Sequence, residues 1–95
     1  MATYVIVDVE ITDAVLHRQF MERVTGTVES HGGRFVVRGD AIRVVEGGWS
    51  PKRLAVLEFP DAGQVDRWLG SPGYTALDDL RSRSSRINMV VVEGS

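Results

Sequence analysis

The 95-residue sequence contains no cysteine, so it can form neither a disulfide framework nor a thiolate site. It also has no excess of basic residues, and a net charge of −2 provides no positive field to attract nucleic acid or an anionic membrane. No apolar run approaches the ~20 residues that a membrane span needs. The first residues lack the charged and apolar regions of a signal peptide. We therefore expect a cytoplasmic protein that binds no nucleic acid and no membrane.

Motifs of several enzyme classes are missing as well. The sequence has no nucleophile elbow, no phosphate-binding P-loop and no dinucleotide fingerprint. Its two histidines, His17 and His31, do not have the spacing of two metal ligands on one helix. We expect neither a metal nor a cofactor.

The composition that remains is that of one small globular domain over residues 1–95, with 43% hydrophobic and 25% charged residues. Asp13 is a suitable N-cap for a helix whose apolar residues recur at every fourth position. Gly32 and Gly33 end that helix, and Ser71 with Pro72 begins a later helical piece. The patterns predict strands over 3–10, 34–38, 52–59 and 87–93, an extension of the second strand over 41–46, and helices over 14–30, 62–69 and from Pro72 onward.

This order of elements predicts an α+β fold of the ferredoxin-like βαββαβ type, with one antiparallel sheet and both helical layers on the same side. The third and last strands are apolar on both faces, at 54–57 and 89–92. A sheet with one solvated face should carry polar residues on that face. A chain of this size has no further element to cover it, so we expect a homodimer in which a second sheet does so.

Many residues along the chain are typical of one family. They are His31-Gly32-Gly33-Arg34-Phe35, Arg38-Gly39, Val45-Glu46-Gly47, Trp49, Pro51, Arg53, Glu58-Phe59-Pro60, Trp68, Ser71-Pro72, Tyr74, Leu77, Arg81 and Val92-Glu93-Gly94. Through them the chain resembles the DUF1330 family of dimeric α+β barrel proteins over its whole length. The resemblance implies two subunits packed sheet against sheet. The family name records an unknown function.

Dimeric α+β barrels are similar in shape to cofactor-free monooxygenases, muconolactone-type isomerases and haem-degrading enzymes. The similarity implies a cavity between the helices and one sheet face, suited to a small aromatic or polyketide-like ligand. Within it, His17 is the candidate general base and Tyr74 the candidate donor to an oxygen that gains charge. The candidate ligand-binding residues are Asp8, Phe20, Arg38, Trp68, Leu77 and Arg81.

Each of these roles has a simpler alternative. The aromatic residues suit a packed core, His17 suits the boundary of a helix stripe, and Asp8 suits a solvated strand end. The arginines at 38, 53 and 81 can pair with the glutamates at 46, 58 and 93, across strands or across the dimer, instead of capturing an anionic ligand. Two functions therefore remain: a small-molecule enzyme or binding protein, or a non-catalytic structural or regulatory homodimer.

Overall fold

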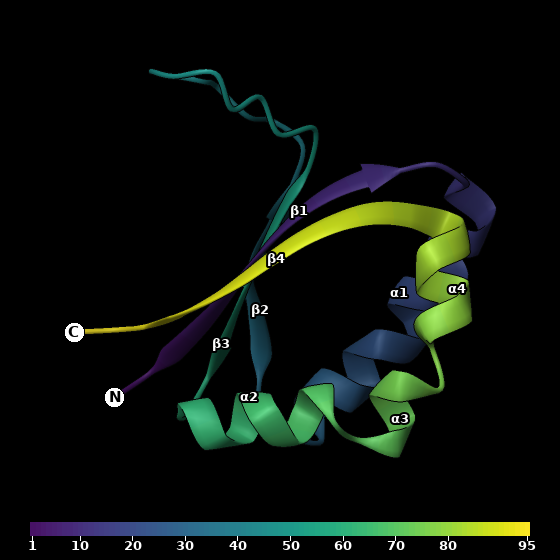
Figure 1. The fold of residues 1–95 in the computed structure, drawn as a ribbon, viewed down its shortest axis with the longest axis vertical. Coiled ribbons are helices and arrows are strands. Elements are labelled where there is room, and N and C mark those ends of the chain that lie inside the picture. The colour runs from purple at the N-terminus through teal and green to yellow at the C-terminus, as the bar shows by residue number, and fades with distance from the viewer.

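The computed structural model describes residues 1–95 and contains one four-stranded sheet with its helices on one side (Figure 1). The elements are β1 (Thr3–Ile11), α1 (Ala14–Glu29), β2 (Arg34–Gly39), β3 (Leu54–Phe59), α2 (Ala62–Leu69), α3 (Pro72–Thr75), α4 (Asp78–Ser84) and β4 (Ser85–Glu93). The strand order is β2-β3-β1-β4, and every neighbouring pair is antiparallel. This is the ferredoxin-like α+β fold that the sequence predicts. None of the helices has the length and apolar character that crossing a membrane requires.

The helix starts agree with the caps expected from the sequence. The Asp13 carboxylate accepts a hydrogen bond from the Leu16 backbone N–H at 3.0 Å, and α1 begins at Ala14, directly after this cap. Asp61 caps α2 in the same way, and the Ser71 hydroxyl caps α3. Each cap satisfies a backbone donor that has no partner inside the helix. The caps thus fix where each helix enters the layer above the sheet.

The inner face of the sheet carries the core. Along β1 the residues Val5, Val7 and Val9 are buried, while the residues between them point to the other face. Phe20, Val24 and Val28 of α1 pack onto these valines with Trp68 and the inward residues of β3. The alternation in the strand and the fourfold spacing in the helix thus meet as one apolar layer.

No helix or strand of this chain covers the outer face of the sheet (Figure 1). Ile6 of β1 lies between Val56 of β3 and Val90 of β4 in the strand register, and Val37 of β2 lies beyond Val56. Val90 is 58% exposed and Val37 is 52% exposed. The centre of this open face is therefore a continuous apolar stripe, which is the feature that the sequence predicts from strands apolar on both sides.

The segment 40–53 departs from the sequence prediction. The sequence predicts that residues 41–46 extend β2, but they form no strand. β3 pairs with β2 only over Arg34–Gly39, so the run has no strand beside it. Figure 1 shows this segment as an arm that leaves the sheet and runs away from the helical layer. Val45 on the arm is 84% exposed.

Two glycines give a matched test of packing. A Cβ on Gly33 would lie 2.6 Å from Cε2 of the buried Phe59 ring, whereas one on Gly26, within α1, would meet nothing within 4 Å. We expect Gly33→Ala to lower the free energy of unfolding by about 1–3 kcal/mol, because the ring must move. Gly26→Ala should raise it by up to about 1 kcal/mol. Urea unfolding of both variants measures the difference, and equal effects would contradict this packing.

Candidate functional site

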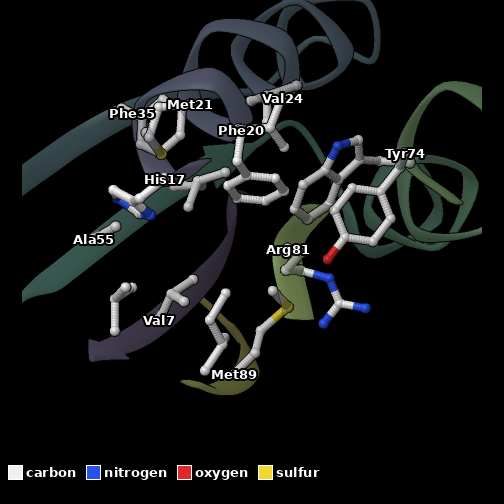
Figure 2. Close-up of a pocket in the computed structure, with 15 residues that line it drawn as sticks. Val7, His17, Phe20, Met21, Val24, Phe35, Ala55, Tyr74, Arg81 and Met89 are labelled. Atoms are coloured by element: carbon white, nitrogen blue, oxygen red, sulfur yellow. The ribbon is translucent and has the colours of Figure 1, made fainter. Parts of the chain in front are cut away.

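A small apolar cavity lies between the inner face of the sheet and α1 (Figure 2). Its volume is about 50 Å³, which exceeds the ~10–15 Å³ that one water needs. In Figure 2 His17 and Met21 lie on one side of it, and Tyr74 and Arg81 lie on the opposite side. The residues that line it are Val7, Val9, His17, Phe20, Met21, Val24, Val28, Phe35, Ala55, Leu57, Trp68, Tyr74, Arg81, Ile87 and Met89.

Two polar atoms at this cavity have no hydrogen-bond partner. They are Nδ1 of His17 and Nε of Arg81, and both are buried. Nearly all buried polar atoms in native proteins are hydrogen-bonded, since an unpaired one costs about 1–3 kcal/mol. Both nitrogens are enclosed by protein atoms, so a ligand group can reach either of them only if a neighbouring side chain moves.

The protonation states of the site follow from burial. His17 is only 8% exposed, and burial, helped by the positive charge of Arg53, lowers the pKa of its imidazole. Burial likewise raises the pKa of the Tyr74 phenol, although the nearby Arg81 charge opposes the shift. At neutral pH the site thus contains a neutral imidazole, which can accept a proton, and a phenol that keeps its O–H.

The lowered pKa of His17 predicts a pH dependence of stability. In the unfolded chain a histidine takes up a proton near pH ~6.5, whereas folded His17 resists it until the pH is lower. Between these two pKa values the unfolded state binds more protons, so the free energy of unfolding falls as the pH falls. Urea unfolding between about pH 7.5 and 5 should show a shallower fall for His17→Phe than for the wild type. Parallel curves would contradict the lowered pKa.

An aromatic cluster lies on the side of the cavity that is opposite His17. The Trp68 ring lies 4.6 Å from Tyr74 and 5.3 Å from Phe59, measured between ring centroids. Its indole N–H donates to the Thr27 hydroxyl at 3.0 Å. The hydrogen bond fixes the indole orientation, and the ring contacts hold Tyr74 against the cavity.

Five of the predicted site residues come together at the cavity: His17, Phe20, Trp68, Tyr74 and Arg81. They come from α1, α2, α3 and α4, and Tyr74 lies on α3 because Ser71 and Pro72 start that short helix. Helical residues far apart in sequence thus form one wall above the sheet.

Three predicted positions are elsewhere. The prediction that Asp8 lines this cavity is wrong, because Asp8 alternates with the inward valines and points to the outer face, where it accepts a hydrogen bond from the Trp49 indole at 3.0 Å. Leu77 is buried in the core but does not line the cavity. Arg38 lies in a neighbouring hollow, with its guanidinium 4.9 Å from the centroid of Phe35.

The sequence analysis missed two flexible lining residues. Met21 of α1 and Met89 of β4 both face the cavity, and Figure 2 shows them on its upper and lower sides. The sequence predicts Met89 in a strand that is apolar on both faces, and neither methionine is among the predicted site residues. Methionine in an inward position is the available signal, because its unbranched thioether adapts to irregular space.

Within the chain, none of the three arginines pairs with the glutamates named in the sequence analysis. Arg81 pairs with Asp78 at 3.1 Å, and Arg53 approaches Asp40 at 4.0 Å. Arg38 has no ion pair, and Glu58 pairs with Arg34 instead. The Arg34 hydrogen bond, followed by one from Tyr4, lowers the pKa of Glu58. The glutamates at 46 and 93 pair with no arginine in the chain. No group of three histidine, aspartate or glutamate side chains is placed to hold a metal ion.

Comparison with known proteins gives one family and several similar folds. The family model described as a domain of unknown function, DUF1330, matches residues 2–95. A protein of unknown function from Rhodopseudomonas palustris is similar with a TM-score of 0.83 at 12% identity, over 99% of this chain and 82% of that one. SnoaB, a cofactor-independent oxygenase from Streptomyces nogalater, has a TM-score of 0.68 at 15% identity, over 99% and 92% of the two chains.

A third similar structure is a dimeric ferredoxin-like protein of unknown function from Jannaschia sp. It has a TM-score of 0.67 at 15% identity and covers 99% of this chain and 100% of its own. No curated protein matches the sequence. At these identities the structural similarities establish the fold alone.

Proposed function

The chain belongs to the DUF1330 family, whose function is unknown, and we propose that it is a homodimer that binds a small, mainly apolar molecule in the cavity between sheet and helices. The observation that carries the proposal is an apolar cavity whose lining residues include His17, Tyr74 and Arg81. An apolar site with a few convergent polar groups is the usual form of a small-molecule site. An aromatic or polyketide-like ligand with one or two oxygen atoms would match it.

His17 and Tyr74 give such a site the means to move a proton. The neutral imidazole could take a proton from an acidic C–H or O–H of the ligand. The negative charge left on the ligand oxygen would then be stabilised by the Tyr74 O–H and by the Arg81 guanidinium. One similar structure is a cofactor-independent oxygenase, which supports chemistry on this fold without a cofactor. The proposed catalytic roles are therefore general base for His17 and donor for Tyr74.

The open face of the sheet supports the homodimer. Its apolar stripe of Val37, Val56, Ile6 and Val90 is central, and no helix or strand covers it, although Trp49 lies near Ile6 and Val90. A contiguous exposed apolar patch usually marks an interaction surface. A second copy of the same sheet matches the stripe in shape and polarity, and similar structures are described as dimeric.

One observation favours the alternative of a non-catalytic structural or regulatory homodimer. The cavity of about 50 Å³ is smaller than the ~150 Å³ apolar cavity that is known to hold benzene. A ligand with an aromatic ring would have to displace Met21 or Met89. If these side chains do not move, the cavity is only an imperfection of the core.

Nuclear magnetic resonance of the indole N–H groups tests the proposal. The protein has two tryptophans, of which Trp68 lines the cavity and Trp49 lies on the outer face. We expect small aromatic alcohols and acids at millimolar concentration to shift the Trp68 signal in a saturable way, with Trp49 unmoved. Trp49→Phe assigns the two signals.

The control fills the cavity from the sheet side. Ala55 is a lining residue on β3, and Ala55→Leu would occupy the space of a ligand. Ala62→Leu, on α2 and away from the cavity, adds the same volume elsewhere. Binding should be lost in the first variant and kept in the second. No shift with any compound in the wild type would instead support the non-catalytic homodimer.

A further inference from the structure

A second hollow lies directly beside the cavity and carries three arginines. Arg18 comes from α1, Arg38 from β2, and Arg53 from the residues just before β3. The hollow is open and has a volume of about 430 Å³. In a chain with a net charge of −2, three cationic side chains around one depression form a local field opposite to that of the whole protein.

The positive charge of this hollow is hardly neutralised. Neither Arg18 nor Arg38 forms an ion pair. Arg53 reaches only Asp40, at 4.0 Å, and the Asp40 side chain is 76% exposed. An exposed contact of that length contributes little. The arginine hollow therefore retains the capacity to bind an anion.

Arg38 is held in an orientation that suits a carboxylate. Its guanidinium lies 4.9 Å from the centroid of the Phe35 ring, which limits its freedom through a cation–π contact. A guanidinium beside an aromatic ring keeps in-plane N–H groups free to donate, and two parallel N–H groups match the two oxygens of a carboxylate. The same Phe35 ring lines the apolar cavity.

The wall between the hollow and the cavity consists of His17 and Met21, which line both. His17 is more than nine-tenths buried, and its Nδ1 has no partner. Met21 is the kind of side chain that moves at little cost. A molecule could thus extend from the charged hollow into the apolar cavity by displacing one thioether and meeting one unsatisfied imidazole nitrogen.

We propose that the ligand of this site is a small apolar carboxylic acid, with its carboxylate on the arginines of the hollow and its aromatic or aliphatic body in the cavity beyond His17 and Met21. This inference rests on the proposed function and adds the charge and polarity of the ligand. A neutral ligand would leave the arginines unpaired, and a simple inorganic anion would leave the cavity unfilled. Only a molecule with both a carboxylate and an apolar body can pair with the arginines of the hollow and also fill the cavity.

Three matched ligands test the inference: 3-phenylpropionate, neutral 3-phenylpropanol, and propionate, which lacks the ring. We expect calorimetry near pH 7.5 to give an affinity for phenylpropionate at least about tenfold above that for either other ligand, because the carboxylate adds charge-assisted hydrogen bonds. Arg38→Gln should remove most of the advantage of the acid over the alcohol. Arg83→Gln is the control, since Arg83 lies on α4 and pairs with Asp79 outside the hollow. The Trp68 indole signal should shift with phenylpropionate in the control and in the wild type.

The outcomes separate this inference from the proposed function. Equal affinities for the acid and the alcohol, unchanged in Arg38→Gln, would overturn the carboxylate assignment while a cavity ligand stands. If propionate and phenylpropionate bind with equal affinity and the Trp68 signal does not shift, the hollow binds anions without the cavity. That result would overturn the proposal that the ligand has both a carboxylate and an apolar body. No binding of any of the three would overturn the inference and contradict the proposed function as well.

Discussion

Replacing Trp68 by alanine is expected to lower the free energy of unfolding by about 3–5 kcal/mol. Trp68 is 2% exposed, contacts the Phe59 and Tyr74 rings, and donates to Thr27. Its loss removes the largest fully buried side chain and opens a hole beside an existing cavity. For a small domain with a stability of about 5–15 kcal/mol, this is a substantial part of the total.

Two further variants identify the cause of that loss. Trp68→Phe keeps an aromatic ring but removes the hydrogen bond to Thr27, so it should cost clearly less than alanine. Val15→Ala, at a 65% exposed position on α1, should change stability by no more than about 0.5 kcal/mol. Urea unfolding at one fixed protein concentration measures all three. A cost below about 1 kcal/mol for Trp68→Ala would be incompatible with a tightly packed indole.

The second large effect is expected in the assembly. Val56→Asp places a carboxylate at the centre of the apolar stripe, between Ile6 and Val37 in the register. If two such stripes pack together, each dimer buries two unpaired carboxylates, which costs several kcal/mol. We expect the wild type to be a dimer at micromolar concentration and Val56→Asp to be a monomer, as measured by light scattering.

Val15→Asp serves as the control, because it introduces the same charge on the exposed side of α1, away from the sheet face. It should remain dimeric. A wild type that is monomeric at micromolar concentration would refute the homodimer. A Val56→Asp variant that stays dimeric would show that the subunits meet through another surface.

The sequence predicted the elements whose signals are local. The Asp13 cap, the fourfold spacing from Phe20 to Val28 and the alternation of Val5, Val7 and Val9 each depend only on near neighbours, and all three are confirmed. The two-faced apolar strands predicted an apolar outer face for a second copy to cover, and the apolar outer face is present. Such patterns are read directly from residue spacing, because the helix and strand periods differ.

The features that depend on distant neighbours were harder to predict. The run 41–46 has strand-forming residues, yet a strand also needs a partner, and none lies beside it in the chain. Arg81 pairs with Asp78, because that carboxylate lies three residues before it on α4. Asp8 was assigned to the cavity from resemblance, although its alternation with the valines indicated the opposite face. Met89 lines the cavity because β4 pairs with β1, and this pairing joins residues that are far apart in the sequence.

The pairing of β1 with β4 has a consequence for synthesis on the ribosome. Of the four strands, β1 is the first to be made and β4 the last, yet they pair along their length, from Thr3 opposite Glu93 to Ile11 opposite Ser85. Contacts that join segments so far apart in sequence form slowly, because a long loop must close first. Until residues 85–93 emerge, β1 has a free edge as well as an apolar outer face. The nascent chain therefore exposes a template for wrong strand pairing until the nine residues of β4 emerge and cover that edge.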